Sequence, residues 1–363
     1  MNKLTIQFSI LLLAILLLAP KDGAFTPALA AQTATLTSQE VNFPELTGPY
    51  KVGLTSFEWV DQSRDETLAS IPGLKRDLMV YIWFPAALAK HTKLAPYMQD
   101  DLMWNIWSGH TGQDSMVHSH AYSTTLLDPD KPSYPVLIFS PCLYCISLNY
   151  ASIMEEIASH GYIVIGTSHP YSTAVINYPD GRVLVGRNLS EAPAMQARWT
   201  QDVRFVLDQV ENLNAKDKDF KGHLDLAHVG VLGHFFAGPI AANVTALDPR
   251  IKAGVTLSGI GSSTDVGSTP FLYFGLPYHS QQTHDKYVVH IDGTSYFNYD
   301  DFGLLLPLIP EIEELEGLSL GSIDPARGIQ IVNSYLLAFF DHYLKGSDLK
   351  WPVYDEAKLI AAQ

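Results

Sequence analysis

The stretch that decides the fold runs from Val229 to Gly238 and reads Val-Gly-Val-Leu-Gly-His-Phe-Phe-Ala-Gly. An apolar run is followed by a glycine-bounded turn and then by the small residues of 239–243. This is the strand–turn–helix setting in which a Gly-x-Ser-x-Gly motif presents a nucleophilic serine. The serine position is occupied by Phe235, whose side chain has neither a proton to release nor a lone pair to attack with. The sequence therefore predicts the scaffold of a serine hydrolase without its reactive atom.

Outward from this stretch, strands and helices alternate along the chain. We expect strands at 50–60, 77–84, 136–139, 162–166, 229–232, 253–257, 271–274 and 287–291, and helices at 149–160, 195–213, 238–247 and 329–344. Several of the strands are continuous apolar runs, which suit a sheet covered on both faces. The pattern predicts an α/β fold with a mostly parallel central sheet, helices on both faces and a ligand site beyond the carboxyl ends of the strands. The irregular segment 91–129 is expected to be an excursion over the surface.

Residues 1–30 have the pattern of a secretory signal peptide. Lys3 supplies the positive charge, residues 10–18 form the apolar region, and Ala28-Leu29-Ala30 is an A-x-A cleavage site. The apolar run is short for a membrane span. We therefore expect an exported protein, periplasmic or extracellular, with an uncleaved membrane anchor as the alternative.

Composition excludes several classes of partner. Hydrophobic residues make up 47% of the 363 residues and charged residues 17%, which favours a large core over disorder. The net charge of −15 argues against nucleic acid and anionic membrane surfaces as partners, so we expect membrane contact only through an uncleaved signal. Nucleotide-binding glycine motifs are absent, and the one close histidine pair, His118 and His120, favours a structural role over metal binding. No metal or cofactor is expected.

Cys142 and Cys145 are the only cysteines and have C-x-x-C spacing. In an exported protein they can form a small disulfide or a redox-active pair. Two small side chains in a loop are favoured, because no thioredoxin-like strand–helix–strand pattern is recognised around them.

Other segments carry a resemblance that extends over nearly all of the mature chain. They are Gly48–Tyr50, Asp61–Arg64, Trp83–Pro85, Phe139–Pro141, Ala158–Tyr162, Asp248–Gly254 and Tyr335–Phe340. In this order and spacing the chain resembles the bacterial relatives of the plasma-type platelet-activating-factor acetylhydrolases, esterases of the α/β-hydrolase fold related to the dienelactone hydrolases. The resemblance implies a signal peptide at 1–30, a leader at 31–47, an α/β-hydrolase domain at 48–350 and a tail at 351–363.

The family's catalytic residues do not carry over. The nucleophile position falls on Phe235, the triad acid on Ser258 in a Leu-Ser-Gly setting, and the triad histidine on Tyr296. The second glycine of the elbow falls on Ala237, whose methyl group we expect to crowd the turn, and a glycine of the oxyanion loop falls on Cys142. Loss of the serine or the histidine alone costs about a millionfold in kcat in a comparable hydrolase. The resemblance thus implies a catalytically degenerate member of the family.

Ser258 and Cys142 are the two candidates for a displaced nucleophile. Ser258 needs a histidine within hydrogen-bond reach, and His279, His284 and His290 lie near the last strands of the chain. Cys142 needs a cation or a helix N-terminus to lower its pKa. A structural role is favoured for both, and His234, directly before the elbow position, is likewise expected to be structural.

What remains is an aromatic pocket with a few polar groups. Phe235, Phe236, Tyr296, Phe297 and Tyr299 are expected to surround the former active site. The expected binding residues are Cys142, Leu143, His234, Phe235, Phe236, Ser258, Tyr296 and Phe297.

These residues either fill a catalytically inactive cleft with packed side chains or bind an apolar or lipid-like small molecule. Two enzymatic alternatives stay open. One is a non-hydrolytic cyclase, isomerase or lyase that uses Tyr296 and Asp301 as acid/base groups, with Ser258 and Asp292 as further polar groups. The other is a carboxylester hydrolase with a displaced nucleophile, which requires a hidden serine–histidine–acid constellation.

Overall fold

The computed structural model describes residues 39–187, 192–258, 264–275, 285–314 and 320–361. The expected signal peptide at 1–30 lies outside these residues. Within them, no helix is long and apolar enough to cross a membrane.

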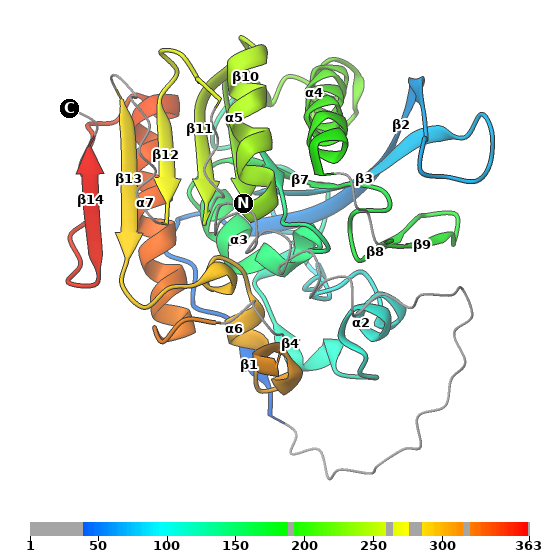
Figure 1. The fold of residues 1–363 in the computed structure, drawn as a ribbon, viewed down its shortest axis with the longest axis horizontal. Coiled ribbons are helices and arrows are strands. Elements are labelled where there is room, and N and C mark those ends of the chain that lie inside the picture. The colour runs from blue at the N-terminus through cyan, green and yellow to red at the C-terminus, as the bar shows by residue number, and fades with distance from the viewer. Residues whose placement is uncertain (1–38, 188–191, 259–263, 276–284, 315–319, 362–363) are drawn as a thin grey trace, which may run out of the picture.

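A ten-stranded mixed sheet forms the centre of the molecule (Figure 1). Its strands are β2 (Val52–Asp65), β3 (Lys75–Pro85), β5 (Ala121–Ser123), β6 (Tyr134–Ser140), β7 (Ile163–Ser168), β10 (Leu224–His234), β11 (Ile251–Leu257), β12 (Phe271–Phe274), β13 (Lys286–Ile291) and β14 (Ala357–Ala361). Their order is β14-β13-β12-β11-β10-β6-β7-β3-β2-β5. The six strands from β13 to β7 are mutually parallel, whereas β3 and β14 run antiparallel to their neighbours β7 and β13.

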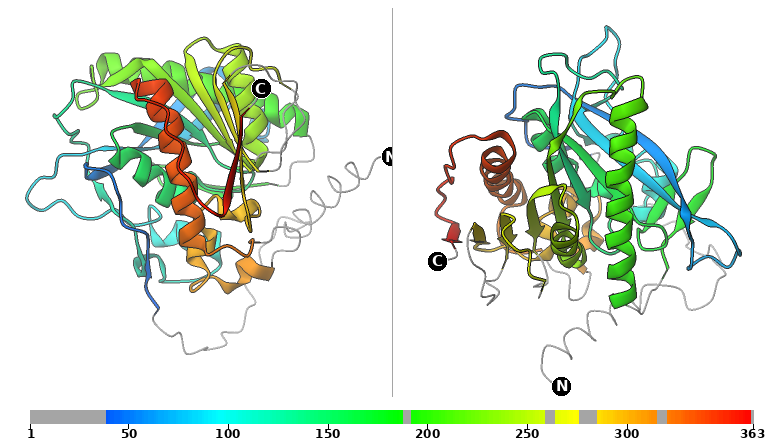
Figure 2. Two further views of the ribbon diagram at one scale, coloured as in Figure 1. Left: turned by 90° about the vertical axis from the view of Figure 1, so that its left-hand side faces the viewer. Right: turned by 90° about the horizontal axis from the view of Figure 1, so that it is seen from above.

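Helices cover both faces of the sheet (Figure 2). On one face, α3 (Ala151–Ser159) packs against α7 (Pro325–Lys345), and on the other α4 (Ala192–Lys216) packs against α5 (Gly238–Leu247). The ends of α7 have local causes: the Asp324 side chain accepts a hydrogen bond from the Arg327 amide at the start, and Gly346 adopts φ 70° at the end. The prediction of a mostly parallel sheet between two helical layers is confirmed.

Shorter elements lie around this core. They are the strands β1 (Val41–Asn42), β4 (Val117–His118), β8 (Val175–Asn177) and β9 (Val183–Val185), the helices α2 (Asp101–Ser108) and α6 (Phe302–Leu305), and the 3₁₀ turns η1 (Asp114–Met116), η2 (Ser147–Tyr150), η3 (Phe235–Ala237), η4 (Tyr296–Asn298) and η5 (Pro310–Glu314).

The structure differs from the sequence prediction in two segments. Segment 91–129 is more than a surface excursion, because Trp104 on α2 is fully buried and β5 adds a strand to the sheet. Large aromatic side chains bury enough apolar area to hold an irregular segment on the core. At the other end, β14 extends the sheet beyond the expected domain boundary at residue 350.

Candidate functional site

The order in which the chain adds strands to the sheet reverses between β6 and β10. The chain leaves β6 through α3 and returns on one side as β7, whereas β10 lies on the other side of β6. In open α/β sheets, ligands bind beyond the carboxyl ends of the strands at such a point. Ser140 ends β6 and pairs with Gly233, so the turn after β10 lies at this crevice.

The turn after β10 keeps the geometry of a nucleophile elbow. Phe235 adopts φ 49°, a left-handed conformation that disfavours a residue with a Cβ. A Cβ on Gly233 would lie 2.2 Å from the carbonyl oxygen of Ala237, which explains the glycine before the turn. Ala237 itself has an ordinary helical φ of −81°. The backbone therefore retains the strained turn without a serine to present.

The positions expected to correspond to the nucleophile and the histidine, Phe235 and Tyr296, are in contact. The rings of Phe235 and Tyr296 meet edge to face, with centroids 4.7 Å apart and an interplanar angle of 68°. Phe235 is buried, whereas Tyr296 on η4 retains 38% of its surface. Ser258, at the acid position, follows β11 with φ 43° and is nearly buried. An aromatic contact thus joins Phe235 and Tyr296.

His234 links the elbow to the loop after β6 through a chain of hydrogen bonds. Its Nε2 lies 3.0 Å from the Tyr296 carbonyl oxygen, which can only accept, so Nε2 carries the proton. Its Nδ1 then accepts from the Tyr150 hydroxyl at 2.7 Å, and that hydroxyl oxygen accepts from the Cys142 amide at 3.1 Å. Burial lowers the pKa of His234 to about 3, so the ring stays neutral near pH 7. The prediction that His234 is structural agrees with this fully bonded geometry.

The other expected aromatic residues diverge from this pair. Phe236 packs edge to face on Trp199 at 5.2 Å, and Phe297 packs on Phe302 at 4.7 Å. Tyr299 lies 6.1 Å from the His234 ring. The structure therefore brings Phe235 and Tyr296 together, whereas Phe236 and Phe297 join other clusters.

The expected acidic groups have other partners. Both carboxylate oxygens of the fully buried Asp301 accept hydrogen bonds at the start of α3, from the amides of Ala151 and Ser152 and from the Ser152 hydroxyl. Tyr97 donates a further hydrogen bond to it at 3.1 Å. Asp292 pairs with Lys358 at the surface. Asp301 thus accepts the amide hydrogen bonds at the N-terminus of α3, while burial raises the pKa of its carboxyl to about 8.

The structure does not supply Ser258 with a histidine among the described residues. His290 bonds instead to Asp292 at 3.2 Å, and a third of its side chain is exposed. His279 and His284 lie outside the described residues.

A serine–histidine–aspartate constellation does exist, at residues that the sequence reasoning missed. His169 Nε2 lies 3.2 Å from Ser140 Oγ, and its Nδ1 lies 2.9 Å from Asp202 Oδ2. Ser140 ends β6, His169 follows β7, and Asp202 lies on α4. Polar residues at the ends of two neighbouring parallel strands were the available signal, but Asp202 is distant in sequence.

This constellation is closed to solvent. Exposed fractions are 2% for Ser140 and 0% for both His169 and Asp202, and Trp199 stacks flat on the imidazole at 3.9 Å. Asp202 also receives two hydrogen bonds from the buried Arg76. Burial alone would raise the pKa of Asp202, but the charge of Arg76 and the hydrogen bonds of its partners hold it below the ordinary value. Burial lowers the pKa of His169.

The cysteine pair is joined by a disulfide, with the Cα atoms of Cys142 and Cys145 5.0 Å apart. It lies between β6 and η2, in the turn of the unit formed by β6, α3 and the parallel strand β7. The strands and the helix of this unit were expected from the sequence at 136–139, 162–166 and 149–160. With both sulfurs bonded, Cys142 has no free thiol to act as a nucleophile.

Metal-ligating side chains do not cluster within the described part of the chain. The His120 amide donates to Glu155 at 2.7 Å and its Nε2 lies 2.9 Å from the Pro44 carbonyl oxygen, while His118 lies 3.5 Å from Glu40.

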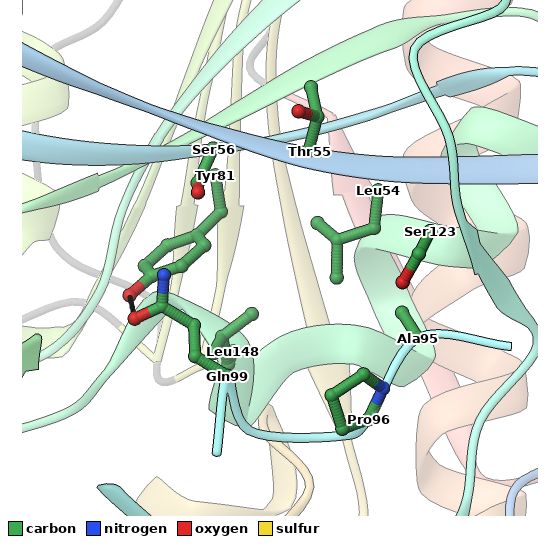
Figure 3. Close-up of a pocket in the computed structure, with 9 residues that line it drawn as sticks. All are labelled: Leu54, Thr55, Ser56, Tyr81, Ala95, Pro96, Gln99, Ser123 and Leu148. Carbon is green, nitrogen blue, oxygen red and sulfur yellow. Dashed lines mark hydrogen bonds between the residues drawn. The ribbon is translucent and has the colours of Figure 1, made fainter. Parts of the chain in front are cut away.

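A cavity of about 260 Å³ lies away from the elbow, between β2, β3 and the segment before α2. Its wall includes Leu54, Tyr81 and Leu148, and Tyr81 donates a hydrogen bond to Gln99 at 3.0 Å (Figure 3).

Comparisons with known proteins agree with this architecture. Residues 35–183 match the family model of platelet-activating factor acetylhydrolase, isoform II. A probable 1-alkyl-2-acetylglycerophosphocholine esterase from Arthroderma benhamiae is 25% identical over 364 residues, covering 84% of this chain and 89% of that protein. Platelet-activating factor acetylhydrolase of Cavia porcellus is 24% identical over 258 residues, 58% of each chain. A ferulic acid esterase from Streptomyces cinnamoneus superposes with a TM-score of 0.76 at 23% identity, covering 89% of this chain and all of that one.

The fold and the elbow place this protein in the α/β-hydrolase class. Within that class the chain is similar to the platelet-activating factor acetylhydrolases and to esterases related to them.

Proposed function

We propose that this protein binds an apolar, lipid-like ligand at the former active site and does not hydrolyse esters there. The observation that carries the proposal is the contact between Phe235 and Tyr296, which leaves neither a nucleophile nor a base at the two positions. Tyr296 is exposed beside a buried ring, so a ligand's apolar chain has an aromatic surface to contact.

The name of the fungal relative suggests the class of ligand. That protein is named as an esterase of 1-alkyl-2-acetylglycerophosphocholine, an ether lipid with one long alkyl chain. We propose lipids of this kind as the ligands, bound without turnover. Export through residues 1–30 would place the protein where it meets such lipids, and N-terminal sequencing of the protein from cell fractions tests that point.

Labelling with a fluorophosphonate, together with hydrolysis of short-chain esters, tests the loss of hydrolysis. The unaltered protein is expected to be silent in both assays. The triple variant Phe235→Ser, Ser258→Asp, Tyr296→His is expected to label at position 235. Its matched control carries Phe236→Ser instead of Phe235→Ser and should stay silent, because that serine lies off the elbow. Labelling of the unaltered protein at the elbow would contradict the proposal.

Binding needs a separate measurement. Calorimetric titration with a 1-alkyl-2-acetylglycerophosphocholine is expected to give saturable binding, weakened about tenfold by Tyr296→Ala, since burying one aromatic contact is worth about 1–2 kcal/mol. Tyr122→Ala, outside the site, is the control. Equal affinity in the two variants would exclude the elbow as the binding site.

The buried constellation supports a second candidate function, ester hydrolysis through Ser140. Its hydrogen bonds follow the order of a serine–histidine–aspartate triad, and Ser140 lies beside the elbow at the end of β6. Full burial and the pairing of Asp202 with Arg76 favour a structural role instead. The two functions separate in the same labelling assay, since Ser140→Ala abolishes labelling only if Ser140 reacts.

A further inference from the structure

We propose that Cys142–Cys145 is a redox-active disulfide that exchanges electrons with dithiols while the protein stays folded. The proposal is independent of the ligand site, because it rests on the loop between β6 and α3 alone.

The first argument is the place of the pair in the fold. A C-x-x-C sequence in the turn between a parallel strand and the following helix is the arrangement used by thiol–disulfide oxidoreductases. Here β6 ends at Ser140, the disulfide occupies the turn, and η2 with α3 leads to the parallel strand β7.

The second argument is that the disulfide contributes little to the stability of the fold. It joins residues only three positions apart. Cross-linking so short a loop restricts the unfolded chain less than cross-linking a long loop does, so stabilisation by the bond is small.

The third argument is that other bonds hold the loop in place. The Cys142 amide donates to the Tyr150 hydroxyl, the Cys145 amide donates to the Cys142 carbonyl at 3.1 Å, and the Tyr144 amide donates to the Ser172 carbonyl at 2.8 Å. None of these hydrogen bonds needs the bond between the sulfur atoms. The loop can therefore open and close its disulfide without unfolding.

The two sulfurs differ in access. Both cysteines are buried, and Cys142 retains slightly more surface, 5% against 2%, so we assign the attack of an incoming thiolate to Cys142. The thiolate attacks Cys142 Sγ, the bond between the protein sulfurs breaks, and its electron pair goes to Cys145 Sγ, which takes up a proton. The second thiolate of the dithiol then attacks the mixed disulfide and releases Cys142. The dithiol loses two electrons, and the protein gains two electrons and two protons as two thiols.

Equilibration of the full chain with mixtures of reduced and oxidised dithiothreitol tests the proposal. After an acid quench and alkylation, mass spectrometry counts the thiols, and circular dichroism reports the fold. We expect both cysteines to be reduced together, in a single transition, with the native spectrum unchanged. A pair that stays oxidised until a denaturant is added would overturn the proposal.

Single variants test which sulfur is attacked. Cys145→Ser leaves the thiol of Cys142, and Cys142→Ser leaves that of Cys145. We expect the first variant to react with 5,5′-dithiobis(2-nitrobenzoate) faster than the second, because Cys142 retains slightly more exposed surface than Cys145. Equal or reversed rates would overturn the assignment of Cys142. If either variant fails to fold, the titration of the unaltered chain still decides whether the pair is redox-active.

Discussion

The ring of Phe235 lies edge to face against the ring of Tyr296, with the two centroids 4.7 Å apart. One residue stands at the strained turn after β10 and the other on η4 after β13. The backbone brings these two positions together, and the contact between them is apolar. Such aromatic pairs contribute about 0.5–1.5 kcal/mol beyond the area they bury.

The strained backbone at residue 235 leads to a first prediction. Phe235→Gly should destabilise the protein less than Phe235→Ala does, by about 1 kcal/mol, because both lose the ring but only alanine keeps a Cβ at φ 49°. Urea unfolding of the two variants measures the difference. Phe236 is the matched control, since its φ is not positive and glycine there should be the more destabilising of the two replacements. If glycine were the more destabilising replacement at Phe235 as well, the turn would not be strained.

The second prediction concerns His234 and pH. Burial holds the folded-state pKa of His234 at about 3, below the ordinary value near 6.5. Between these values the unfolded chain binds a proton that the folded protein does not, so the contribution of His234 to stability falls as pH drops below about 6.5. From pH 6.5 to pH 4 the loss should approach about 3 kcal/mol.

Urea unfolding across this pH range, with His234→Gln beside the unaltered protein, measures the effect. The variant lacks the titrating group, so the stability difference between the two proteins should shrink as pH falls. His228→Gln is the control, because that histidine is half exposed and pairs with Asp225 at the surface. A pH-independent difference between His234→Gln and the unaltered protein would refute the assignment.

Much of the fold follows from local pattern. The helix at Gly238–Leu247 and the strand at Phe271–Phe274 agree with the prediction to the residue, because proline and small residues open the former and an apolar run forms the latter. Segment 91–129 was misjudged, since its packing depends on where Trp104 is buried rather than on any periodicity. The pairing of β14 with β13 likewise depends on tertiary contacts rather than on local sequence pattern.

In the candidate site, too, some features were predicted from the sequence and others were not. The family resemblance singled out Phe235 and Tyr296, which the structure brings into contact. Phe236 and Phe297 follow these residues directly, yet their rings turn toward Trp199 and Phe302. Side-chain direction at a turn depends on backbone torsions that sequence spacing does not encode.

The third prediction tests the hydrogen-bond chain at Tyr150. Tyr150→Phe keeps the ring but leaves the Cys142 amide and His234 Nδ1 without their partner. A buried polar group without a partner costs about 1–3 kcal/mol, so the variant should unfold at lower urea concentration. Tyr50→Phe is the control, because its hydroxyl bonds to Asp130 near the surface and its loss should cost little. Equally small losses of stability in both variants would contradict the hydrogen-bond chain through Tyr150.

The last prediction decides whether Ser140, His169 and Asp202 form a structural cluster or an active triad. In a structural cluster the central group is Asp202, because it neutralises the buried Arg76 and also bonds to His169. Asp202→Asn should then cost about 3–5 kcal/mol, since it leaves a buried charge partly uncompensated. Ser140→Ala removes one neutral hydrogen bond and should cost about 1 kcal/mol. Asp65→Asn, which breaks an exposed ion pair with Lys75, should change stability by less than about 1 kcal/mol. Urea unfolding measures all three, and a triad held in place for catalysis would instead show Ser140→Ala unfolding like the unaltered protein while fluorophosphonate labelling disappears.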